Sequence, residues 1–283
     1  MNIYIVIPAH NEEDFIGKTL ESLAQQTLLP KKLVVVADNC TDNTLKITQQ
    51  YARRFAYIEV VQYQSSEQHL PGSKVINAFN KGFEILDEDY DLICKFDADL
   101  IFPKNYLKTL AHHFIQDERL GIAGGFCYVE NNSEWILENI TNKDHIRGAL
   151  KTYRKQCFED IGKLKASIGW DTVDELLAKF YNWNVQTDAS LKVKHLRPTG
   201  STYNQNAKLL QGEAMYKMRY GFVITWISAI KIAFKKKKIS IISDYLKGYN
   251  LAKSNNIPFL VNEEQGAFIR HLRWKGIFKK LGI

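Results

Sequence analysis

The chain has 283 residues, of which 45% are hydrophobic and 24% are charged, so it can bury a sizeable core and is not expected to be disordered. Its formal net charge of +7 indicates a partner of opposite sign, such as a phosphate, a nucleic acid or an anionic membrane surface. The four cysteines show no C-x-x-C spacing and no zinc pattern with histidine, which indicates free thiols in a reducing cytosol.

The sequence carries no signal for export or membrane insertion. It runs from Met1 directly into the strand-like residues 3–8, without the basic start and the cleavage site of a signal peptide. No apolar run reaches the roughly 20 residues that a spanning helix needs. We therefore expect a cytoplasmic protein that is at most peripheral on the inner face of the cell membrane.

Strand-like and helix-like segments alternate through the first half of the chain. The predicted strands cover residues 3–8, 32–38, 57–63, 91–96 and 121–129, and the predicted helices cover residues 12–26, 41–54, 72–86 and 103–116. This alternation is typical of an α/β fold in which a mainly parallel central sheet is flanked by helices.

The second half is more helical and less regular. Helices are predicted at residues 153–161 and 172–183, a strand at 188–196, and a largely helical and unusually basic stretch at 210–255. We expect a catalytic domain at residues 1–205, with a nucleotide-binding half up to about residue 100 and an acceptor half from about 101 to 205. Residues 206–283 are expected to form a basic C-terminal helical extension.

Two acids, Asp97 and Asp99, follow the strand predicted at residues 91–96. Open α/β sheets bind ligands outside the carboxyl ends of their strands, which is where both acids fall. Neighbouring carboxylates repel each other unless a cation lies between them, and oxygen ligands suit Mg²⁺ or Mn²⁺. Because Mg²⁺ sites commonly combine carboxylates with substrate phosphates, a diphosphate substrate is expected. The alternative is an ordinary turn after a strand, where Asp is common.

Polar clusters also follow the first two predicted strands. The first strand ends in Pro8-Ala-His10-Asn-Glu12, and the second ends in Asp38-Asn-Cys-Thr-Asp42. Pro8 is expected to stop strand pairing and to direct the residues after it into the crevice. Asp38 is expected to accept a hydrogen bond from a ring N–H of a nucleobase, whereas Asp42 is better explained as a cap of the next helix.

Gly72-Ser73-Lys74 stands at the start of the third predicted helix. It offers backbone N–H groups and a cation to a phosphate, and Asn77 lies one turn from Lys74 on the same helix face. It is not a Walker A loop, because the first glycine of that motif is absent. The alternative for Lys74 is an ordinary solvated lysine.

In this order the four motifs resemble those of the family 2 inverting glycosyltransferases of the GT-A fold, over residues 3 to about 225. The resemblance implies a Rossmann-like domain that takes a sugar from a nucleotide-diphosphate donor. It implies that Asp97 and Asp99 hold Mn²⁺ or Mg²⁺ on the diphosphate. The nucleotide-binding residues expected from the motifs are Pro8, His10, Glu12, Asp38, Lys74, Asn77 and Asp97.

Residues 148–162 are similar to the segment that shapes the floor of the sugar and acceptor site in this family. The resemblance therefore places Tyr153 and Arg154 at that site. Trp170 is a candidate apolar wall for a sugar ring, although it could equally belong to the core.

Residues 169–179 are similar to the segment that holds the catalytic base in this family. The family usually has Glu-Asp where this chain has Val173-Asp174. Asp174 matches the family's Asp best by its distance to the following Leu and Lys, and Asp171 and Glu175 remain alternatives. These acids could also simply cap and charge the N-terminus of a helix.

His195 and Arg197 follow the strand predicted at residues 188–196. A histidine near this point is the third metal ligand in many enzymes of the GT-A fold, so the resemblance makes His195 a candidate ligand. Arg197 is expected to face phosphate. The alternative for His195 is an ordinary surface histidine.

Residues 221–239 combine an apolar, aromatic-rich stretch with the four lysines Lys235–Lys238. This combination suits a helix that lies in an anionic membrane interface, which would favour a lipid-linked acceptor. The alternative is a buried helix that packs on the catalytic domain and is followed by a solvated lysine run.

Together the motifs predict a metal-dependent inverting transferase that moves a sugar to a hydroxyl of a glycan or lipid-linked acceptor, in cell-surface polysaccharide synthesis. A sugar nucleotidyltransferase is an alternative, although the acidic loop after the first strand lacks a Gly-rich, Arg-containing grip on a triphosphate. A nonenzymatic membrane- or polyanion-binding protein would explain the basic tail but not the polar strand ends. No nucleic-acid-binding signature is present, and the oligomeric state is left open.

Overall fold

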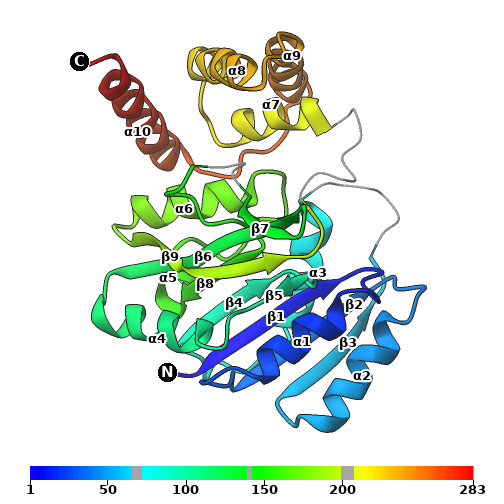
Figure 1. Cartoon of the computed structure of the whole chain (residues 1–283). Coiled ribbons are helices and arrows are strands. Elements are labelled where there is room, and N and C mark those ends of the chain that lie inside the picture. Colours follow the sequence, from blue (N-terminus) through cyan, green and yellow to red (C-terminus); the bar gives the residue numbers. More distant parts are fainter. Residues whose placement is uncertain (66–71, 139–141, 199–206, 283) are drawn as a thin grey trace.

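The computed structural model describes residues 1–65, 72–138, 142–198 and 207–282 (Figure 1). Within these residues, nine strands form one mixed sheet with the order β3-β2-β1-β4-β8-β6-β9-β5, and β7 pairs with β6. The strands are β1 (Ile3–Ala9), β2 (Lys32–Asp38), β3 (Ile58–Tyr63), β4 (Leu92–Phe96), β5 (Leu100–Ile101), β6 (Leu120–Asn131), β7 (Glu134–Leu137), β8 (Leu150–Arg154) and β9 (Asn184–His195).

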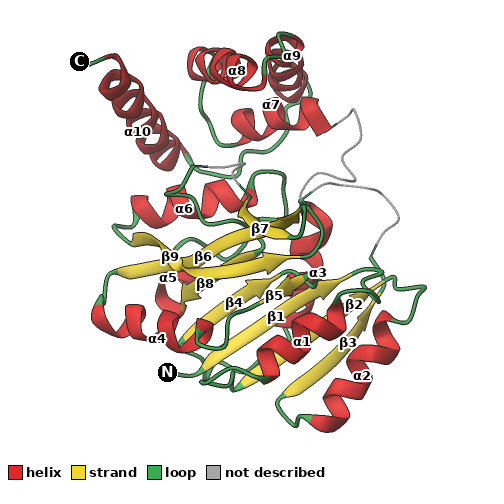
Figure 2. Cartoon of the chain, in the orientation of Figure 1, coloured by secondary structure: helices red, strands yellow, loops and turns green. Residues whose placement is uncertain are grey.

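Helices cover both faces of this sheet, and a separate group of helices lies at one end of the molecule (Figure 2). α1 and α2 pack on one face, and α3 and α5 on the other, where Phe79 and Phe83 of α3 contact Phe158 of α5. The helices are α1 (Ile16–Ala24), α2 (Thr44–Arg54), α3 (Ser73–Phe83), α4 (Tyr106–Gln116), α5 (Lys155–Asp160), α6 (Trp170–Phe180), α7 (Ala207–Lys217), α8 (Phe222–Lys236), α9 (Ser240–Ser254) and α10 (Glu263–Leu281).

The predicted α/β fold with a mainly parallel centre is confirmed. β1 pairs in parallel with β2 and with β4, and β2 pairs in parallel with β3. Residues 3–7 and 33–36 form unbroken apolar runs, as expected of strands that are covered on both faces, and all of them are buried. The sheet becomes antiparallel at β8, which pairs with both β4 and β6.

β1 lies where the order of the strands in the sheet reverses: β2 and β3 follow on one side of it, and β4 lies on its other side. β1 pairs with β2 up to Ala9, but it pairs with β4 only from Ile3 to Val6. The expectation that Pro8 stops pairing therefore holds toward β4 and is wrong toward β2, where Pro8 lies opposite Val36. The two strands separate at their carboxyl ends, and such a switch point is where open α/β sheets bind ligands.

The largest error of the sequence analysis concerns Tyr153, which was expected in a helix. It lies in β8, because Leu150-Lys-Thr-Tyr-Arg154 stays extended and α5 begins only at Lys155. β5, β7 and β8 were not predicted, because each is short. α4 begins at Tyr106, and the amide of Tyr106 donates to the carbonyl of Pro103 in a preceding turn.

The C-terminal extension consists of helices packed on one another and on the catalytic domain. α7 and α9 approach closely at Gly212 and Gly248, where a Cβ atom would lie 1.9 Å from a backbone oxygen of the opposite helix. α10 lies in the expected helical extension, although no individual helix was predicted there; its Ile269 is buried, and α10 contacts α6. The expected domain boundary at 205–206 lies outside the described residues. No described helix combines the length and the apolarity that crossing a bilayer requires.

Candidate active site

A cavity of about 380 Å³ opens at the carboxyl ends of β1, β2 and β4. All four motifs singled out in the sequence contribute to its wall, because the ends of parallel strands meet at one edge of a sheet. The cavity is lined by Pro8, Ala9, His10, Glu12, Asp38, Asn39, Ser65, Lys74, Val75, Ala78, Asp97, Ala98, Asp99 and Arg197.

Two asparagines shape the loops that follow β1 and β2. Asn11 and Asn39 have φ values of 53° and 47°, in the left-handed region that Asn tolerates better than most residues. The side-chain oxygen of Asn11 accepts a hydrogen bond from the amide of Thr41 at 2.8 Å, so the two loops are joined. Nδ1 of His10 lies 2.7 Å from the carbonyl oxygen of Asp38, which adds a second link between them.

Asp38 lies in the cavity wall and is only 6% exposed. Its Oδ1 accepts a hydrogen bond from the amide of Ser65 at 3.0 Å. This bond fixes the orientation of the carboxylate at the end of β2.

Glu12 and Arg197 form an ion pair in the cavity wall, although they are 185 residues apart in the chain. Arg197 donates two hydrogen bonds to the carboxylate of Glu12, at 2.6 and 3.2 Å, in the forked geometry that arginine favours. Burial raises the pKa of Glu12 to about 7; Arg197 opposes this rise, and the nearby Asp99 and Asp97 add to it. The cavity is therefore rich in negative charge.

Asp97 is paired with Lys95, which precedes it by two residues and is only 2% exposed. Nζ of Lys95 also donates to the carbonyl oxygen of Gly148 at 3.1 Å and lies over the ring of Trp170. Although burial raises the pKa of Asp97, the charge of Lys95 outweighs it and lowers the pKa below its usual value. Asp97 is therefore ionised in the folded protein.

Asp99 lies beside His195, as the sequence analysis anticipated for a shared metal site. Nε2 of His195 is 3.4 Å from Oδ2 of Asp99, and its Nδ1 is 2.9 Å from Oε2 of Glu138. Burial lowers the pKa of His195, but the hydrogen bonds with Asp99 and Glu138 raise it to about 9 overall. Arg147 donates to the same Oε2 of Glu138 at 2.6 Å.

This arrangement matches the chemistry of a divalent-metal site. A metal-binding histidine usually has its second ring nitrogen hydrogen-bonded to a carboxylate, as Glu138 is to His195. Carboxylate oxygen and imidazole nitrogen are ligands that Mn²⁺ accepts. Cys127 also lies near, since it, Glu138 and His195 each place one potential ligand atom within 4.8 Å of the others.

Asp174, the base favoured from the sequence, is buried, and both of its carboxylate oxygens accept hydrogen bonds. Lys151 donates to its two carboxylate oxygens at 2.8 and 2.7 Å, and the hydroxyl of Tyr153 donates to Oδ2. The side chain of Asp174 is 2% exposed, and burial raises its pKa. It does not line the cavity.

Asp171, named as an alternative base, lies in the first turn of α6, and its side chain is 36% exposed. His145 lies between two of the acids: its Nε2 is 3.7 Å from Asp171 and its Nδ1 is 3.1 Å from Glu175. Although burial raises the pKa of Asp171, His145 and Lys151 outweigh it, so the pKa is lowered and Asp171 is ionised at neutral pH. The third candidate, Glu175, accepts a hydrogen bond from the amide of Ile146 and is buried.

Several other predicted residues do not face the cavity. Lys74 lines it, but Asn77, one turn further along α3, is exposed and is not among the lining residues. Arg154 donates to the carbonyl oxygens of Phe114, Asp117 and Leu120. Its expected contact with sugar or acceptor is therefore not supported by this geometry.

Two buried lysines were missed by the sequence analysis. Lys95 and Lys151 lie directly opposite each other in the β4–β8 ladder, and both ammonium groups approach the ring of Trp170. Trp170 therefore lies against two cations and is mostly buried, rather than forming an open sugar wall. The sequence feature that could have revealed them is a lysine inside each strand, where the neighbouring residues are buried.

The sequence matches a family model described as "Glycosyl transferase family 2" over residues 4–165, more than half of the chain. It is 29% identical over 147 residues to a probable glycosyltransferase, YdaM, of Bacillus subtilis; the match covers 51% of this chain and 34% of YdaM. It is 22% identical over 191 residues to a poly-β-1,6-N-acetyl-D-glucosamine synthase of Staphylococcus aureus, covering 60% and 42% of the two chains. The chain thus spans about half or less of the length of these relatives.

Solved structures share the fold. TarS of S. aureus (residues 1–349), in complex with UDP-GlcNAc, superposes with a TM-score of 0.57 at 18% identity, over 90% of this chain and 75% of that one. The mannosyltransferase PcManGT of Pyrobaculum calidifontis, in complex with GDP-Man and Mn²⁺, gives a TM-score of 0.56 at 14% identity, over 99% and 81%. The predicted GT-A fold is confirmed by these neighbours. The chain belongs to glycosyl transferase family 2.

Proposed function

We propose that the cavity binds a nucleotide-diphosphate sugar and that a divalent cation is bound with it. The observation that carries this proposal is that Asp38, Asp97 and Asp99 converge from the ends of β2 and β4 on one cavity beside β1. The structural neighbours with UDP-GlcNAc and with GDP-Man and Mn²⁺ support it, because they share the fold.

The nucleotide end of the donor is assigned to the β1–β2 side of the cavity. Asp38, whose Oδ1 is held by Ser65, would accept from a ring N–H of the base through its second oxygen. Pro8 and His10 form the wall beside it. Lys74 and Arg197 supply positive charge to the diphosphate from α3 and from the segment after β9, respectively.

Asp99 and His195 are the residues best suited to hold Mn²⁺ or Mg²⁺. His195 is oriented by Glu138, and the cation would occupy the region now shared by Nε2 of His195 and Oδ2 of Asp99. Asp97 is assigned to the same cation through the carboxylate oxygen that Lys95 does not contact. When bound, the metal would neutralise the charge that develops on the departing diphosphate.

We assign the general base to Asp171 in place of Asp174. A base must reach the acceptor hydroxyl and must be unprotonated. Neither acid lines the cavity, but Asp171 is partly exposed and its pKa is lowered, whereas Asp174 is buried and its pKa is raised. It would take the hydroxyl proton while the acceptor oxygen attacks the anomeric carbon from the side opposite the diphosphate, which inverts that carbon. Lys151 and Tyr153 are assigned a structural role because they bind Asp174 in the interior.

The acceptor is proposed to be a hydroxyl of a glycan or of a lipid-linked glycan in polysaccharide synthesis. The S. aureus relative is named as a synthase of a polymer of N-acetyl-D-glucosamine, which supports this class of product. The sugar nucleotidyltransferase alternative lacks this support, since the family match is to glycosyltransferases.

The proposal is tested by screening UDP-, GDP- and dTDP-sugars for slow release of nucleoside diphosphate, with and without Mn²⁺. We expect release from one donor class, dependent on Mn²⁺, and at least a hundredfold loss in the Asp99→Asn variant. Glu118→Gln, an exposed acid in the α4–β6 turn, is the matched control. Equal release without metal, or full activity of Asp99→Asn, would refute the metal assignment; release from no donor would refute the proposed donor.

A further inference from the structure

Helix α8 has two faces of different character. Its inner face consists of small or short side chains, among them Ala229 and Ala233, which are buried against α9 in one cluster with Ile241 and Tyr245. Its outer face carries large apolar side chains. Val223, Trp226 and Phe234 are 55%, 47% and 79% exposed and stand three and eight residues apart, on one side of the helix. Phe222, which is 49% exposed, lies toward α9, where its ring centre is 6.1 Å from that of Tyr249.

Exposed aromatic side chains are concentrated in this part of the molecule. Among the described residues, every exposed Phe or Trp belongs to the C-terminal extension: Phe222, Trp226, Phe234, Phe259 and Phe278. Phe and Trp side chains are usually mostly buried in a folded protein. A cluster of exposed ones therefore indicates a contact surface.

A run of four lysines lies at the C-terminal end of α8. Lys235–Lys238 are all exposed, and the next residue, Ile239, is 83% exposed. Residues 206–283 contain fifteen lysines and arginines and only four acids, whereas the whole chain has an excess of only seven positive charges. The part of the chain before residue 206 is therefore net negative, and the basic character of the protein resides in the extension.

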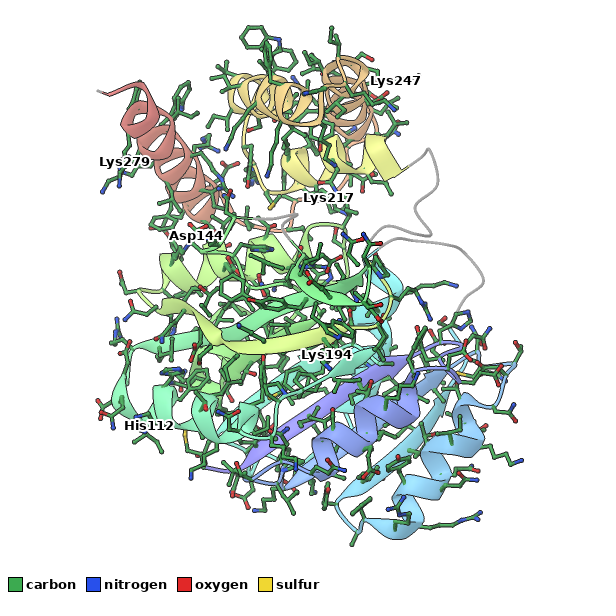
Figure 3. All side chains as sticks on the ribbon, in the orientation of Figure 1. His112, Asp144, Lys194, Lys217, Lys247 and Lys279 are labelled. Atoms are coloured by element: carbon green, nitrogen blue, oxygen red, sulfur yellow. The ribbon has the colours of Figure 1, made fainter. Side chains whose placement is uncertain are left out.

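The end of α10 adds a second element of the same kind. Trp274 stacks on Phe278 with ring centres 5.6 Å apart, and Lys275 and Lys279 are exposed around them. α10 contacts α8, and Figure 3 shows Lys279 projecting outward from the side of α10.

We propose that the outer face of α8 and the turn after it, comprising Val223, Trp226, Phe234, Lys235–Lys238 and Ile239, dock on the surface of an anionic lipid bilayer. Apolar side chains inserted at the acyl boundary and lysines at the headgroups are the two components of interfacial binding. A purely polyanionic partner would use the lysines but would leave the aromatic side chains in water. The surface is separate from the cavity, so this inference does not depend on the proposed reaction.

The test is co-sedimentation of the full chain with vesicles of phosphatidylcholine alone or mixed with phosphatidylglycerol. We expect binding to the anionic vesicles that is at least tenfold tighter than binding to the neutral ones. Trp226, the one exposed tryptophan of the five, should give a blue shift in fluorescence that is absent from Trp226→Phe.

Paired variants separate the two components. Phe234→Ser and Lys235→Glu/Lys236→Glu should each weaken binding at least tenfold. Ile115→Ser and Lys108→Glu, at exposed positions of α4, are the matched controls and should bind like the unaltered chain. All five substituted residues are exposed, so each of the four variants should fold, which circular dichroism checks.

Three outcomes would overturn the proposal. Absence of binding to anionic vesicles is the first. The second is vesicle binding that the lysine substitutions abolish but Phe234→Ser does not affect. If the chain also binds inorganic polyphosphate, the lysines form a polyanion site instead. A dimer in light scattering that Phe234→Ser converts to a monomer, without vesicle binding, would show that the face contacts a second copy.

Discussion

Lys151 donates hydrogen bonds to both carboxylate oxygens of Asp174, at 2.8 and 2.7 Å, and neither side chain is more than 2% exposed. A buried ion pair of this kind stabilises the fold only while both partners are present, because one partner alone leaves an uncompensated charge in the interior. The pair ties β8 to α6, the helix that also carries Asp171.

The first prediction is that Asp174→Asn destabilises the protein. The substitution leaves the ammonium of Lys151 with a neutral partner, so the free energy of unfolding in urea should fall by about 3–5 kcal/mol. Glu118→Gln, at an exposed site, should change it by less than about 0.5 kcal/mol. An Asp174→Asn protein of unaltered stability that binds donor but transfers no sugar would return the role of base to Asp174.

The second prediction is that Asp171→Asn removes transfer and spares the fold. Asp171 is partly exposed but pairs with His145, so its loss should cost less stability than Asp174→Asn, whereas loss of a general base should lower the rate by about 100-fold or more. Donor affinity, measured by titration calorimetry, should stay within about threefold of the unaltered protein, because the base acts on the acceptor. Normal transfer by this variant would exclude Asp171 as the base.

The fold and most of the cavity could be predicted from the sequence. Alternation of strands and helices determines a parallel sheet, and in such a sheet Pro8, Glu12, Asp38 and Asp97 necessarily come to one edge. The acids of α6 were harder to assign. Which face of a helix is buried depends on what packs against it. β8, which supplies the partners of Asp174, was not predicted, and its last two residues were assigned to a helix.

The site features that could not be predicted depend on residues that are distant from each other in the chain. Lys95 and Lys151 are paired in an antiparallel ladder, and Asp174, the acid that binds Lys151, lies on α6. No local pattern reveals a register between two strands separated by more than 50 residues. The same applies to Arg197 and Glu12, because the ion pair joins the first loop to a segment after the last strand of the sequence.

The third prediction concerns the Arg197–Glu12 pair. Arg197→Gln removes the cation that pairs with Glu12 in a cavity that also contains Asp97 and Asp99, so repulsion of the diphosphate should increase. We expect the dissociation constant of the nucleoside diphosphate to rise about tenfold, which corresponds to about 1.4 kcal/mol, and its dependence on salt to weaken. Binding of the corresponding nucleoside, which carries no phosphate, should be unchanged.

The control for this variant is Arg119→Gln, at an exposed arginine in the α4–β6 turn. It should bind the diphosphate like the unaltered protein. If Arg197→Gln weakens nucleoside and diphosphate equally, Arg197 acts by holding the loop after β1 and not by contacting phosphate.

The fourth prediction is a dependence of stability on pH that comes from His145. Burial lowers its pKa, but the hydrogen bonds with Asp171 and Glu175 raise it from 6.5 to about 9 overall. Between these values the folded protein holds a proton that the unfolded chain has released. The contribution of His145 is therefore complete below about pH 6.5 and is lost as the pH rises through 9. At about 1.4 kcal/mol per pKa unit, the loss is up to about 3 kcal/mol.

The measurement is urea unfolding of the unaltered protein and of His145→Gln at pH 6 and at pH 9.5. The difference in unfolding free energy between the two proteins should shrink as the pH rises, because only the unaltered protein loses the charged imidazole between Asp171 and Glu175. Tyrosines and cysteines that titrate in this range are common to both proteins and cancel in the difference. A difference that stays constant or grows with pH would show that His145 is neutral in the folded protein, and the lowered pKa of Asp171 would then have to come from Lys151 alone.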